Sequence, residues 1–376
     1  MKRRKRKTTE NDNEQTSRRR WIQAVNCSHV MNDEGRAKKE GTAGTVVRIC
    51  SYNILSERAA EKYKHELYRN KSSEEMKFAR RLNKIQREIK ETDSDLICLQ
   101  EVDFFRIKEI SDGIGNEYEY RFARKGKGKT DGCAIFWKRE KFTLKKYVSV
   151  SERCFGCFGL ICALKSLKEN DDVFVVGNAH LLFAPKNGFV KLAQLQKFMN
   201  TIETVRRKMK CAAAKLIAID GNFLPNSALY KVMTEASSGF RKESCNRRNM
   251  GGYLNDDDDM IADDDDEENL NLKSWDPSFV AEESYENVFN EEGIARLKYP
   301  KTSVMQSAYK IAMQNEPIFT SLHQKFCGTT DYIFFDEEVL KVHRVLETPK
   351  INKGHTLPNA RYPSDHVSLV VEFNRV

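Results

Sequence analysis

The stretch EEMKFARRLNKIQREIKETDSDLICLQEV, residues 74–102, contains the signals of two different elements in direct succession. In its first part, apolar residues recur every three or four positions and predict an amphipathic helix over 74–91. These residues are Met76, Ala79, Leu82, Ile85 and Ile89. In its second part, DLICLQEV is a short apolar run typical of a buried strand. The helix followed by the strand indicates a layered protein of mixed α and β structure.

Further runs rich in β-branched and aromatic residues flank this stretch, and each predicts a strand. They are VVRICSYNIL (46–55), CAIFWK (133–138), GLICALK (159–165), VFVVGNAHLL (173–182), KLIAID (215–220), DYIFF (331–335), KVHRVL (341–346) and HVSLVVEF (366–373). Two more helices are expected at 189–209 and 226–236. Strands alternate with helices early and later follow one another in pairs, which favours two sheets packed face to face with helices outside. The predicted fold class is α/β or α+β, in layers.

The composition excludes several classes of protein. The chain has 376 residues, 40% hydrophobic and 32% charged, so it can bury a large core. No run approaches the roughly 18 consecutive apolar residues of a membrane span, and the N-terminal MKRRKRKTTE lacks the apolar run of a secretory signal. Several of the ten cysteines lie inside apolar runs, which indicates reduced thiols. We therefore expect a protein of the cytoplasm, the nucleus or both, without a membrane partner.

The net charge of +9 is unevenly distributed. The run DDDDMIADDDDEE, residues 256–268, holds ten acidic residues, so the rest of the chain carries +19. Such an excess favours a polyanionic partner, although a basic soluble protein with exposed lysines gives the same count. Because a block of like charges repels itself, the irregular segment at about 241–299 is predicted to be a disordered acidic insertion on the surface.

Residues 1–44 are polar, charged and weakly patterned, which predicts a flexible basic N-terminal arm. Two basic clusters within it, 2–7 and 18–20, fit a nuclear-import signal, a nonspecific RNA-binding arm or a solvated tail. The remaining residues, 45–376, are predicted to form a single domain that carries the acidic insertion.

Polar residues follow the strand-forming runs where the strands end. Layered sheets build their sites from the loops at one edge, so these residues are candidates for a common site. They are Asn53, Glu101, His180, Asp220, Asn222, Asp331, Asp365 and His366. Carboxylates at one edge can hold a hard divalent cation, and histidines can donate to phosphate oxygens or transfer protons near neutral pH. A single strand-end carboxylate more often serves a turn, but eight polar residues together are hard to attribute to turns.

These residues lie in motifs that resemble a known family. The motifs are SYNIL, LQEV, DGCAIFWK, GNAHLLFAP, IDGNFLPNSALY, TTDYIFF and YPSDHVSLVVEF, in this order. They resemble the endonuclease/exonuclease/phosphatase superfamily, in its branch of nocturnin, the carbon catabolite repression deadenylases and the Angel proteins. The stretches 78–102 and 180–196 are most similar to Angel. The resemblance implies a four-layer sandwich of two mixed β-sheets flanked by helices, and residues 45–376 as one catalytic domain. It also implies Mg²⁺ as cofactor, with Mn²⁺ as a substitute.

The matching motifs imply a role for each polar residue. Glu101 is expected to be the principal metal ligand, with Asn53 and Asp365 on the metal side of the site. Asp220 is expected to orient or deprotonate the attacking water, and Asn222 to bind the scissile phosphate. Such a set agrees with the needs of in-line attack on a phosphodiester, which requires a cation, an aligned water and a proton donor.

The two histidines complete the implied catalytic set. His180 is expected to stabilise charge on the phosphate oxygens, and Asp331 to fix the tautomer of His366. One motif departs from the family pattern of Gly-Asp, apolar residue, Asn and small residue, because this chain has Ile-Asp-Gly-Asn-Phe over 219–223. The changed glycine position alters backbone freedom beside the reacting groups, so an impaired enzyme is one of the hypotheses.

Four further residues are candidates for substrate binding. Pro185 and Phe326 occupy positions where the deadenylase relatives place a proline and a phenylalanine against the terminal adenine, although Phe326 also fits a core position. Arg124 and Lys125 open the basic loop RKGKGKTDG (124–132), which either follows an RNA backbone or forms a plain hairpin turn.

The resemblance implies a Mg²⁺-dependent hydrolase that acts on single-stranded RNA 3′ ends, first of all a 3′-to-5′ exoribonuclease that removes poly(A). Hydrolysis of a 2′,3′-cyclic phosphate at an RNA 3′ end is the alternative, because of the Angel-like stretches. A catalytically impaired RNA-binding adaptor is the third hypothesis. Factors of mRNA decay or translation are the expected protein partners.

Overall fold

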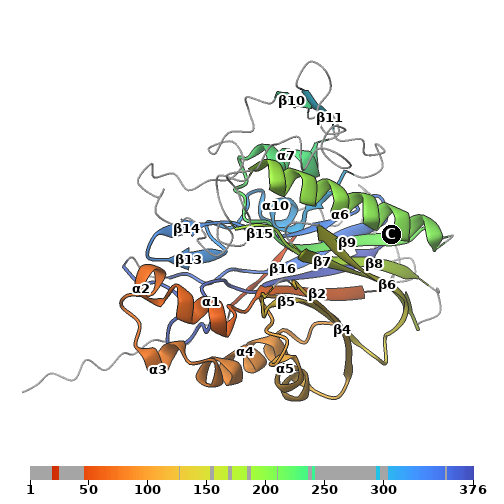
Figure 1. Ribbon diagram of the computed structural model, residues 1–376. Coiled ribbons are helices and arrows are strands. Elements are labelled where there is room, and N and C mark those ends of the chain that lie inside the picture. Colours follow the sequence, from red (N-terminus) through yellow and green to blue (C-terminus); the bar gives the residue numbers. More distant parts are fainter. Residues whose placement is uncertain are drawn as a thin grey trace, which may run out of the picture.

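Two mixed β-sheets pack face to face in the computed structural model, and helices cover their outer sides (Figure 1). The structure describes residues 19–24, 46–126, 128–152, 156–167, 172–183, 188–209, 211–235, 239–241, 294–296, 304–351 and 354–376. Pro185 and most of the acidic segment 241–299 lie outside these residues. No helix among the described residues combines the length and apolar character needed to cross a bilayer.

The larger sheet has seven strands in the order β1-β16-β17-β2-β3-β5-β4. Its strands are β1 (Trp21–Gln23), β2 (Val46–Asn53), β3 (Leu96–Gln100), β4 (Tyr118–Arg124), β5 (Gly132–Lys138), β16 (Leu340–Leu346) and β17 (Leu369–Arg375). The pair β2 and β3 is parallel, and every other neighbouring pair of this sheet is antiparallel.

The smaller sheet has the order β12-β15-β9-β8-β7-β6. Its strands are β6 (Phe142–Glu152), β7 (Gly156–Ser166), β8 (Val173–His180), β9 (Ala214–Asp220), β12 (Gln306–Ser307) and β15 (Asp331–Phe335). Here β8 and β9 are the parallel pair. Two short antiparallel pairs stand apart from the sheets, β10 (Gly239–Arg241) with β11 (Ile294–Arg296), and β13 (Ser321–His323) with β14 (Phe326–Gly328).

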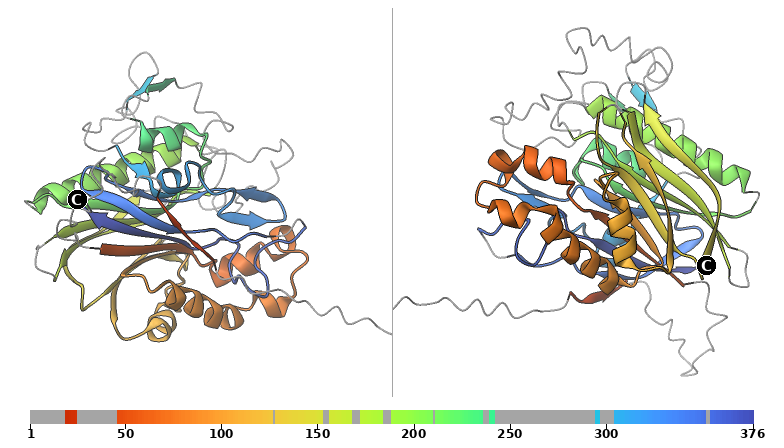
Figure 2. Two further views of the ribbon diagram at one scale, coloured as in Figure 1. Left: turned by 180° about the vertical axis from the view of Figure 1, so that it is seen from behind. Right: turned by 60° about the horizontal axis from the view of Figure 1, so that its bottom comes forward.

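Helices form the two outer layers, as the views in Figure 2 show from other sides. The described helices are α1 (Glu57–Lys62), α2 (Lys64–Leu67), α3 (Ser73–Met76), α4 (Phe78–Thr92), α5 (Ile107–Ile114), α6 (Gly188–Lys208), α7 (Ala228–Thr234) and α10 (Ala308–Met313). Apolar residues of α4 and α5 pack on the outer face of the seven-stranded sheet, and those of α6 and α7 on the six-stranded sheet. A third apolar cluster fills the space between the sheets. The predicted four-layer sandwich is confirmed.

The predicted helix 74–91 is wrong in one respect, because the structure has two helices there. Ser72 caps α3 in a reciprocal capping box with Glu75. Lys77 is then extended, with ψ of 127°, and α4 starts at Phe78. The freed carbonyl of Met76 accepts a hydrogen bond from Nε of Arg81 at 3.2 Å. A local side-chain contact therefore accompanies the break in the helical pattern at this point.

The predicted N-terminal arm also needs correction where the structure describes it. Trp21–Gln23 form β1, which pairs with β16, so this short stretch belongs to the sheet and is not flexible. Arg19 supports the attachment, because its guanidinium donates to the carbonyls of Glu347 and Ser368. The other residues of 1–44 lie outside the described part of the chain, and their flexibility stays a prediction.

Candidate active site

The strand ends that carry the predicted site residues meet at one edge of both sheets. The parallel strands β2 and β3 end at Asn53 and Gln100, with Glu101 next, and the parallel strands β8 and β9 end at His180 and Asp220 in direct register. The antiparallel β15 starts opposite, with Asp331 paired to Asp220. Parallel neighbours end on the same side and an antiparallel neighbour starts there, so five residues far apart in sequence come together.

A pocket opens at this edge, and most predicted residues line it. The lining includes Glu101, Lys125, His180, Asp220, Asn222, Phe326, Asp365 and His366. Asn53 and Asp331 are buried directly behind this wall and hydrogen-bond to its members. Arg124 is not among the lining residues, and Pro185 is not described. Most of the predicted site residues therefore lie together at one pocket, while the role of each residue stays a prediction.

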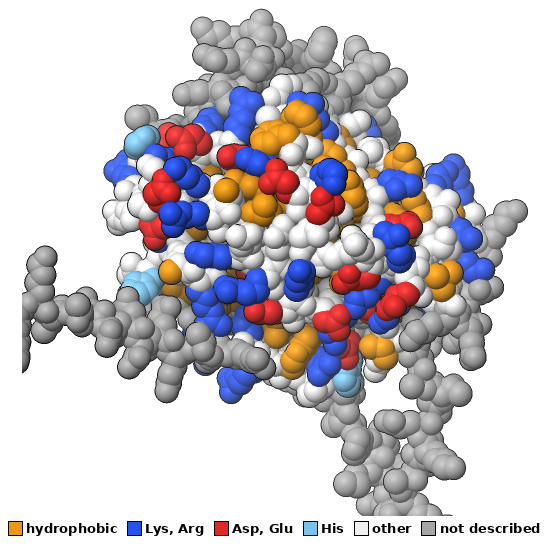
Figure 3. Space-filling model, turned by 90° about the horizontal axis from the view of Figure 1, so that it is seen from below, with side chains coloured by type: hydrophobic (Ala, Val, Ile, Leu, Met, Phe, Trp, Pro, Cys, Tyr) orange, Lys and Arg blue, Asp and Glu red, His pale blue; other side chains and the backbone are white. Residues whose placement is uncertain are grey.

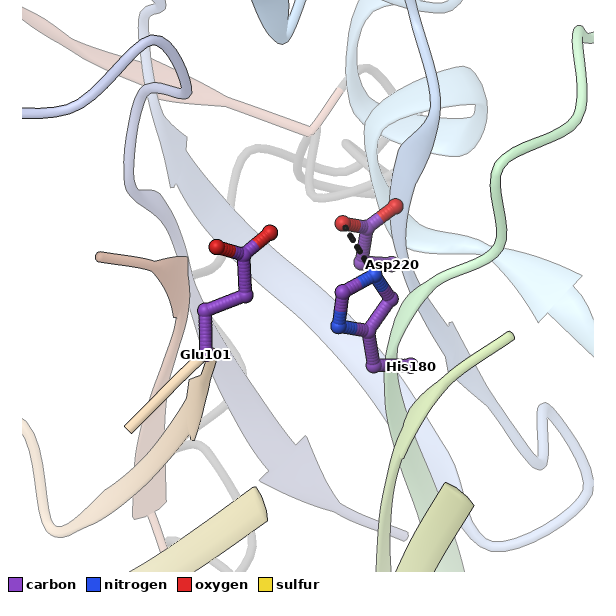
Figure 4. Close-up of side chains that lie close together, drawn as sticks. All are labelled: Glu101, His180 and Asp220. Atoms are coloured by element: carbon purple, nitrogen blue, oxygen red, sulfur yellow. Dashed lines mark ion pairs between the residues drawn. The ribbon is translucent and has the colours of Figure 1, made fainter. Parts of the chain in front are cut away.

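Asn53 connects the two sheets within the site. Its Nδ2 donates to Oε1 of Glu101 at 3.0 Å and to Oδ2 of Asp220 at 2.7 Å, and its Oδ1 accepts from the backbone N–H of Leu55. Glu101 lies across the pocket from Asp220 and His180 (Figure 4), and Nε2 of His180 is 3.6 Å from Oδ2 of Asp220. The amide of Asn53 therefore holds both carboxylates in fixed positions.

The donor set suits a hard divalent cation. One ligand atom each of Glu101, His180 and Asp220 lies within 4.8 Å of the others. Burial and the negative charges of Asp365 and Asp131 raise the pKa of Glu101 to about 7. Carboxylates that repel one another in a partly dry site are stabilised when a cation binds among them. The residues present therefore fit a metal such as Mg²⁺.

Cation binding is expected to weaken as the pH falls through 7. Glu101 must be ionised to bind a cation, and its raised pKa means that protons compete with the metal below about pH 7. Isothermal titration with Mg²⁺ is expected to give a Kd about tenfold higher at pH 6 than at pH 8, as one competing proton requires. Equal Kd values at both pH values would show that Glu101 is not a ligand.

The two histidines differ in protonation. Burial and the positive charge of Lys125 lower the pKa of His180 to about 4, so this ring is neutral at pH 7. Burial also lowers the pKa of His366, but the negative charges of Asp331 and Asp220 have the larger effect. Together they raise the pKa of His366 well above its usual value. Nδ1 of His366 lies 2.8 Å from Oδ2 of Asp331. A neutral donor and a protonated imidazole thus share one pocket.

Three site residues adopt left-handed backbone conformations that are rare for non-glycine residues. They are Leu55, Glu101 and Asn222, with φ of 54°, 56° and 48°. Such a conformation costs of order 1–3 kcal/mol per residue and persists only when the surrounding structure enforces it. For Glu101 the N–H of Ser56 supplies one restraint, since it donates to Oε2 at 3.0 Å.

The altered motif over 219–223 is locally compensated. A Cβ on Gly221 would lie 2.3 Å from the ring of Phe223, which stacks on Tyr332 with centroids 5.1 Å apart. Glycine at position 221 therefore leaves the space that the ring of Phe223 occupies. Nδ2 of Asn222 donates to the carbonyl of Leu181, and its backbone N–H to Asp220.

Three residues that the sequence analysis did not identify support the site. Asp131 pairs with Nζ of Lys125 at 2.8 Å, which aims this ammonium at Nδ1 of His180 at 3.3 Å. The hydroxyl of Tyr68 donates to Asp365 at 2.7 Å. Arg81 is buried, and its guanidinium reaches the backbone next to Asn53 and Asp365. Asp131 stands in the quoted motif DGCAIFWK and could have been found there, whereas Tyr68 and Arg81 carry no local signal.

Replacing Arg81 is expected to destabilise the protein strongly. Its guanidinium donates to the carbonyls of Ile54, Leu55 and Pro363, which lie within two residues of Asn53 or Asp365 in the chain. Arg81→Leu leaves these carbonyls without a donor, so urea denaturation is expected to show a loss of at least about 3 kcal/mol.

Arg87→Leu is the matched control for Arg81, because Arg87 is an exposed residue of the same helix. The free energy of unfolding of Arg87→Leu is expected to lie within about 0.5 kcal/mol of the wild-type value. Equal unfolding midpoints for the two variants would contradict the structural role of Arg81.

A four-layer sandwich with a pocket of carboxylates and histidines at one edge has the fold and the residue types of a phosphodiesterase or phosphatase. The sequence pattern of the Endonuclease/Exonuclease/phosphatase family matches residues 50–366, and the chain belongs to this family. The predicted family is confirmed.

Several proteins of known sequence or structure are similar to this chain. Carbon catabolite repressor protein 4 homolog 3 of Arabidopsis thaliana is 30% identical over 86% of this chain and 74% of its own. Protein angel homolog 2 of Homo sapiens is 26% identical over 86% and 68%. The crystal structure of ANGEL2, described as a 2′,3′-cyclic phosphatase in complex with adenosine-2′,3′-vanadate, matches with a TM-score of 0.69 and 25% identity. The match covers 91% of this chain and 99% of the crystallised ANGEL2 chain. The human nocturnin catalytic domain shares the fold, with a TM-score of 0.56 and 20% identity. This match covers 88% of this chain and 94% of the nocturnin chain.

Proposed function

We propose that the protein is a Mg²⁺-dependent hydrolase of 2′,3′-cyclic phosphate at RNA 3′ ends. The observation that carries the proposal is the pocket itself, in which the carboxylate of Glu101 faces Asp220, His180 and His366. When bound at Glu101, a divalent cation neutralises charge that develops on the phosphate oxygens.

The residues of the chain divide the remaining work. Asp220, fixed by the amide of Asn53, accepts a proton from the attacking water. The water oxygen bonds to phosphorus and one ribose oxygen leaves, taking a proton from His366, whose positive charge Asp331 maintains. His180 donates from Nε2 to a phosphate oxygen, because Nδ1 faces the ammonium of Lys125. A second hydrolysis of the resulting monoester releases inorganic phosphate and leaves both ribose hydroxyls.

Similarity favours the cyclic phosphate over a poly(A) tail. The crystallised chain of ANGEL2 is matched over 99% of its length, and its structure contains an adenosine-2′,3′-vanadate. Poly(A) removal by 3′-to-5′ hydrolysis is the second candidate, because a relative named as a carbon catabolite repressor homolog is the more similar in sequence, at 30%. The same water attack serves both reactions, since each cleaves a phosphorus–oxygen bond to ribose.

One experiment distinguishes the two reactions. Purified protein with Mg²⁺ is incubated with 5′-labelled RNA that carries either a 2′,3′-cyclic phosphate or a 3′-hydroxyl poly(A) tail. We expect release of inorganic phosphate from the first RNA at constant length. Progressive shortening of the second RNA would favour the exonuclease. RNA binding without turnover of either substrate would favour the impaired adaptor.

A further inference from the structure

Phe104 and Phe105 lie next to each other on the surface between β3 and α5. Their exposed fractions are 42% and 46%, and their ring centroids are 5.4 Å apart in an edge-to-face arrangement. Among the phenylalanines with described side chains, these two are the exposed ones. Burial of a phenylalanine side chain stabilises a fold by about 1.5–3 kcal/mol. Two neighbouring phenylalanines that stay exposed do not provide this stabilisation, and they indicate a contact surface.

Arginines accompany both rings. Cζ of Arg124 lies 4.0 Å from the centroid of Phe104, and Cζ of Arg106 lies 5.4 Å from that of Phe105. Arg106 is ion-paired with Glu57. Within the described segments, no carboxylate lies within 4.0 Å of the Arg124 guanidinium, whose Nε donates to the carbonyl of Lys129. Aromatic rings and a charged planar guanidinium on one surface suit the bases and phosphates of a nucleic acid.

This surface is continuous with the rim of the active-site pocket. The backbone N–H of Phe104 donates to the carbonyl of Thr130 at 2.9 Å, and Thr130 lines the pocket. The hydroxyl of Thr130 in turn donates to Asp103 at 2.6 Å. Glu101 precedes Phe104 by only three residues. An extended strand that leaves the pocket on this side therefore meets the two rings next.

The face of the molecule that is seen from below carries side chains of both charge signs. Seen from below, Lys and Arg side chains alternate with Asp and Glu, and hydrophobic side chains lie between them (Figure 3). The positive net charge is not gathered into one continuous field on this face. Stacking on aromatic rings tolerates any base, so it can hold a strand of variable sequence.

We infer that Phe104, Phe105 and Arg124 form a stacking platform for the nucleotides that lie 5′ to the terminal nucleotide of a single-stranded RNA. The inference rests on the proposed function, because it requires an RNA 3′ end in the pocket. It gives Arg124 a place in substrate binding outside the pocket, whereas Lys125 points into the pocket. Substrate recognition then depends on RNA length rather than on base sequence.

The test compares the double variant Phe104→Ala/Phe105→Ala with wild type and with Tyr147→Ala. Tyr147 is the matched control, because it is 52% exposed with Cζ of Arg121 5.2 Å from its ring, and it does not line the pocket. Affinity for a fluorescent single-stranded RNA decamer with a 3′-hydroxyl is measured by anisotropy without metal. We expect the Kd of the double variant to rise about tenfold, equal to about 1.4 kcal/mol, and that of Tyr147→Ala to stay at the wild-type value.

A kinetic arm separates the platform from the proposed function. The ratio of kcat/KM for a decamer with a 2′,3′-cyclic phosphate to that for adenosine 2′,3′-cyclic phosphate is expected to fall about tenfold in the double variant. If wild type hydrolyses neither substrate, the proposed function fails, and the anisotropy values still decide the platform. If the Kd of the double variant for the decamer lies within twofold of the wild-type value, the two rings are not a stacking platform for RNA. The aromatic pair would then be a contact surface for a protein partner.

Discussion

Glu101→Gln is expected to lower kcat for the cyclic phosphate by at least about a thousandfold, because the variant loses the charged cation ligand. Metal-ion catalysis contributes several kcal/mol, and about 4 kcal/mol corresponds to this factor. The isosteric amide keeps the shape of the pocket. Turnover at saturating Mg²⁺ is the measurement, and Glu91→Gln, exposed on α4, is the control with wild-type activity.

The same variant is expected to unfold at the wild-type temperature or above it. The folded-state pKa of Glu101 is raised, so the folded protein binds this proton more tightly than the unfolded chain does. Stability from this group is therefore present at low pH and is lost as the pH rises from about 4.5 to about 7. At pH 8 the charge destabilises the fold, and its removal relieves the repulsion by Asp365. A large loss of Tm together with activity would instead indicate misfolding and would contradict the assigned role.

Asp331→Asn is expected to lower kcat by roughly 10²- to 10⁴-fold, the range that a positioned proton donor contributes. Oδ2 of Asp331 lies 2.8 Å from Nδ1 of His366 and accepts hydrogen bonds from the hydroxyls of Thr320 and Thr330. An amide in its place removes the charge that keeps His366 protonated. The imidazole then loses its proton at a lower pH.

The pH–rate profile tests this role of Asp331 separately from the fold. In wild type the raised pKa of His366 is expected to set the decline of kcat at high pH. In Asp331→Asn that decline should begin at a lower pH. If the variant loses activity with an unchanged profile, His366 is not the proton donor.

The central strands and the site at their ends were predictable from sequence because each depends on a local pattern. VFVVGNAH and KLIAID are buried along their whole length, so their apolar runs match the strands β8 and β9 closely. Once two parallel pairs are assumed, their terminal Asn, Glu, His and Asp must meet at one edge. Asn53, His180 and Asp220 were found because each ends or follows a strand-forming run.

What the sequence did not predict depends on contacts between distant segments. Tyr68 and Asp365 are 297 residues apart, and no pattern near Tyr68 indicates that its hydroxyl reaches the site. The interruption at Lys77 has a local cause instead, because Arg81 bonds the carbonyl of Met76 five residues away, in a region of continuous helical periodicity. The exposure of Phe104 and Phe105 is opposite to what two adjacent phenylalanines suggest.

The central claim is that these residues surround one cation at the place where a phosphate ester is cleaved. Anomalous diffraction from crystals grown with Mn²⁺ and adenosine monophosphate tests it most directly. We expect a metal peak at about 2.0–2.3 Å from the Glu101 carboxylate, with the nucleotide phosphate between the metal and His366. A metal bound elsewhere, or a phosphate held away from Asp220 and His366, would contradict the account.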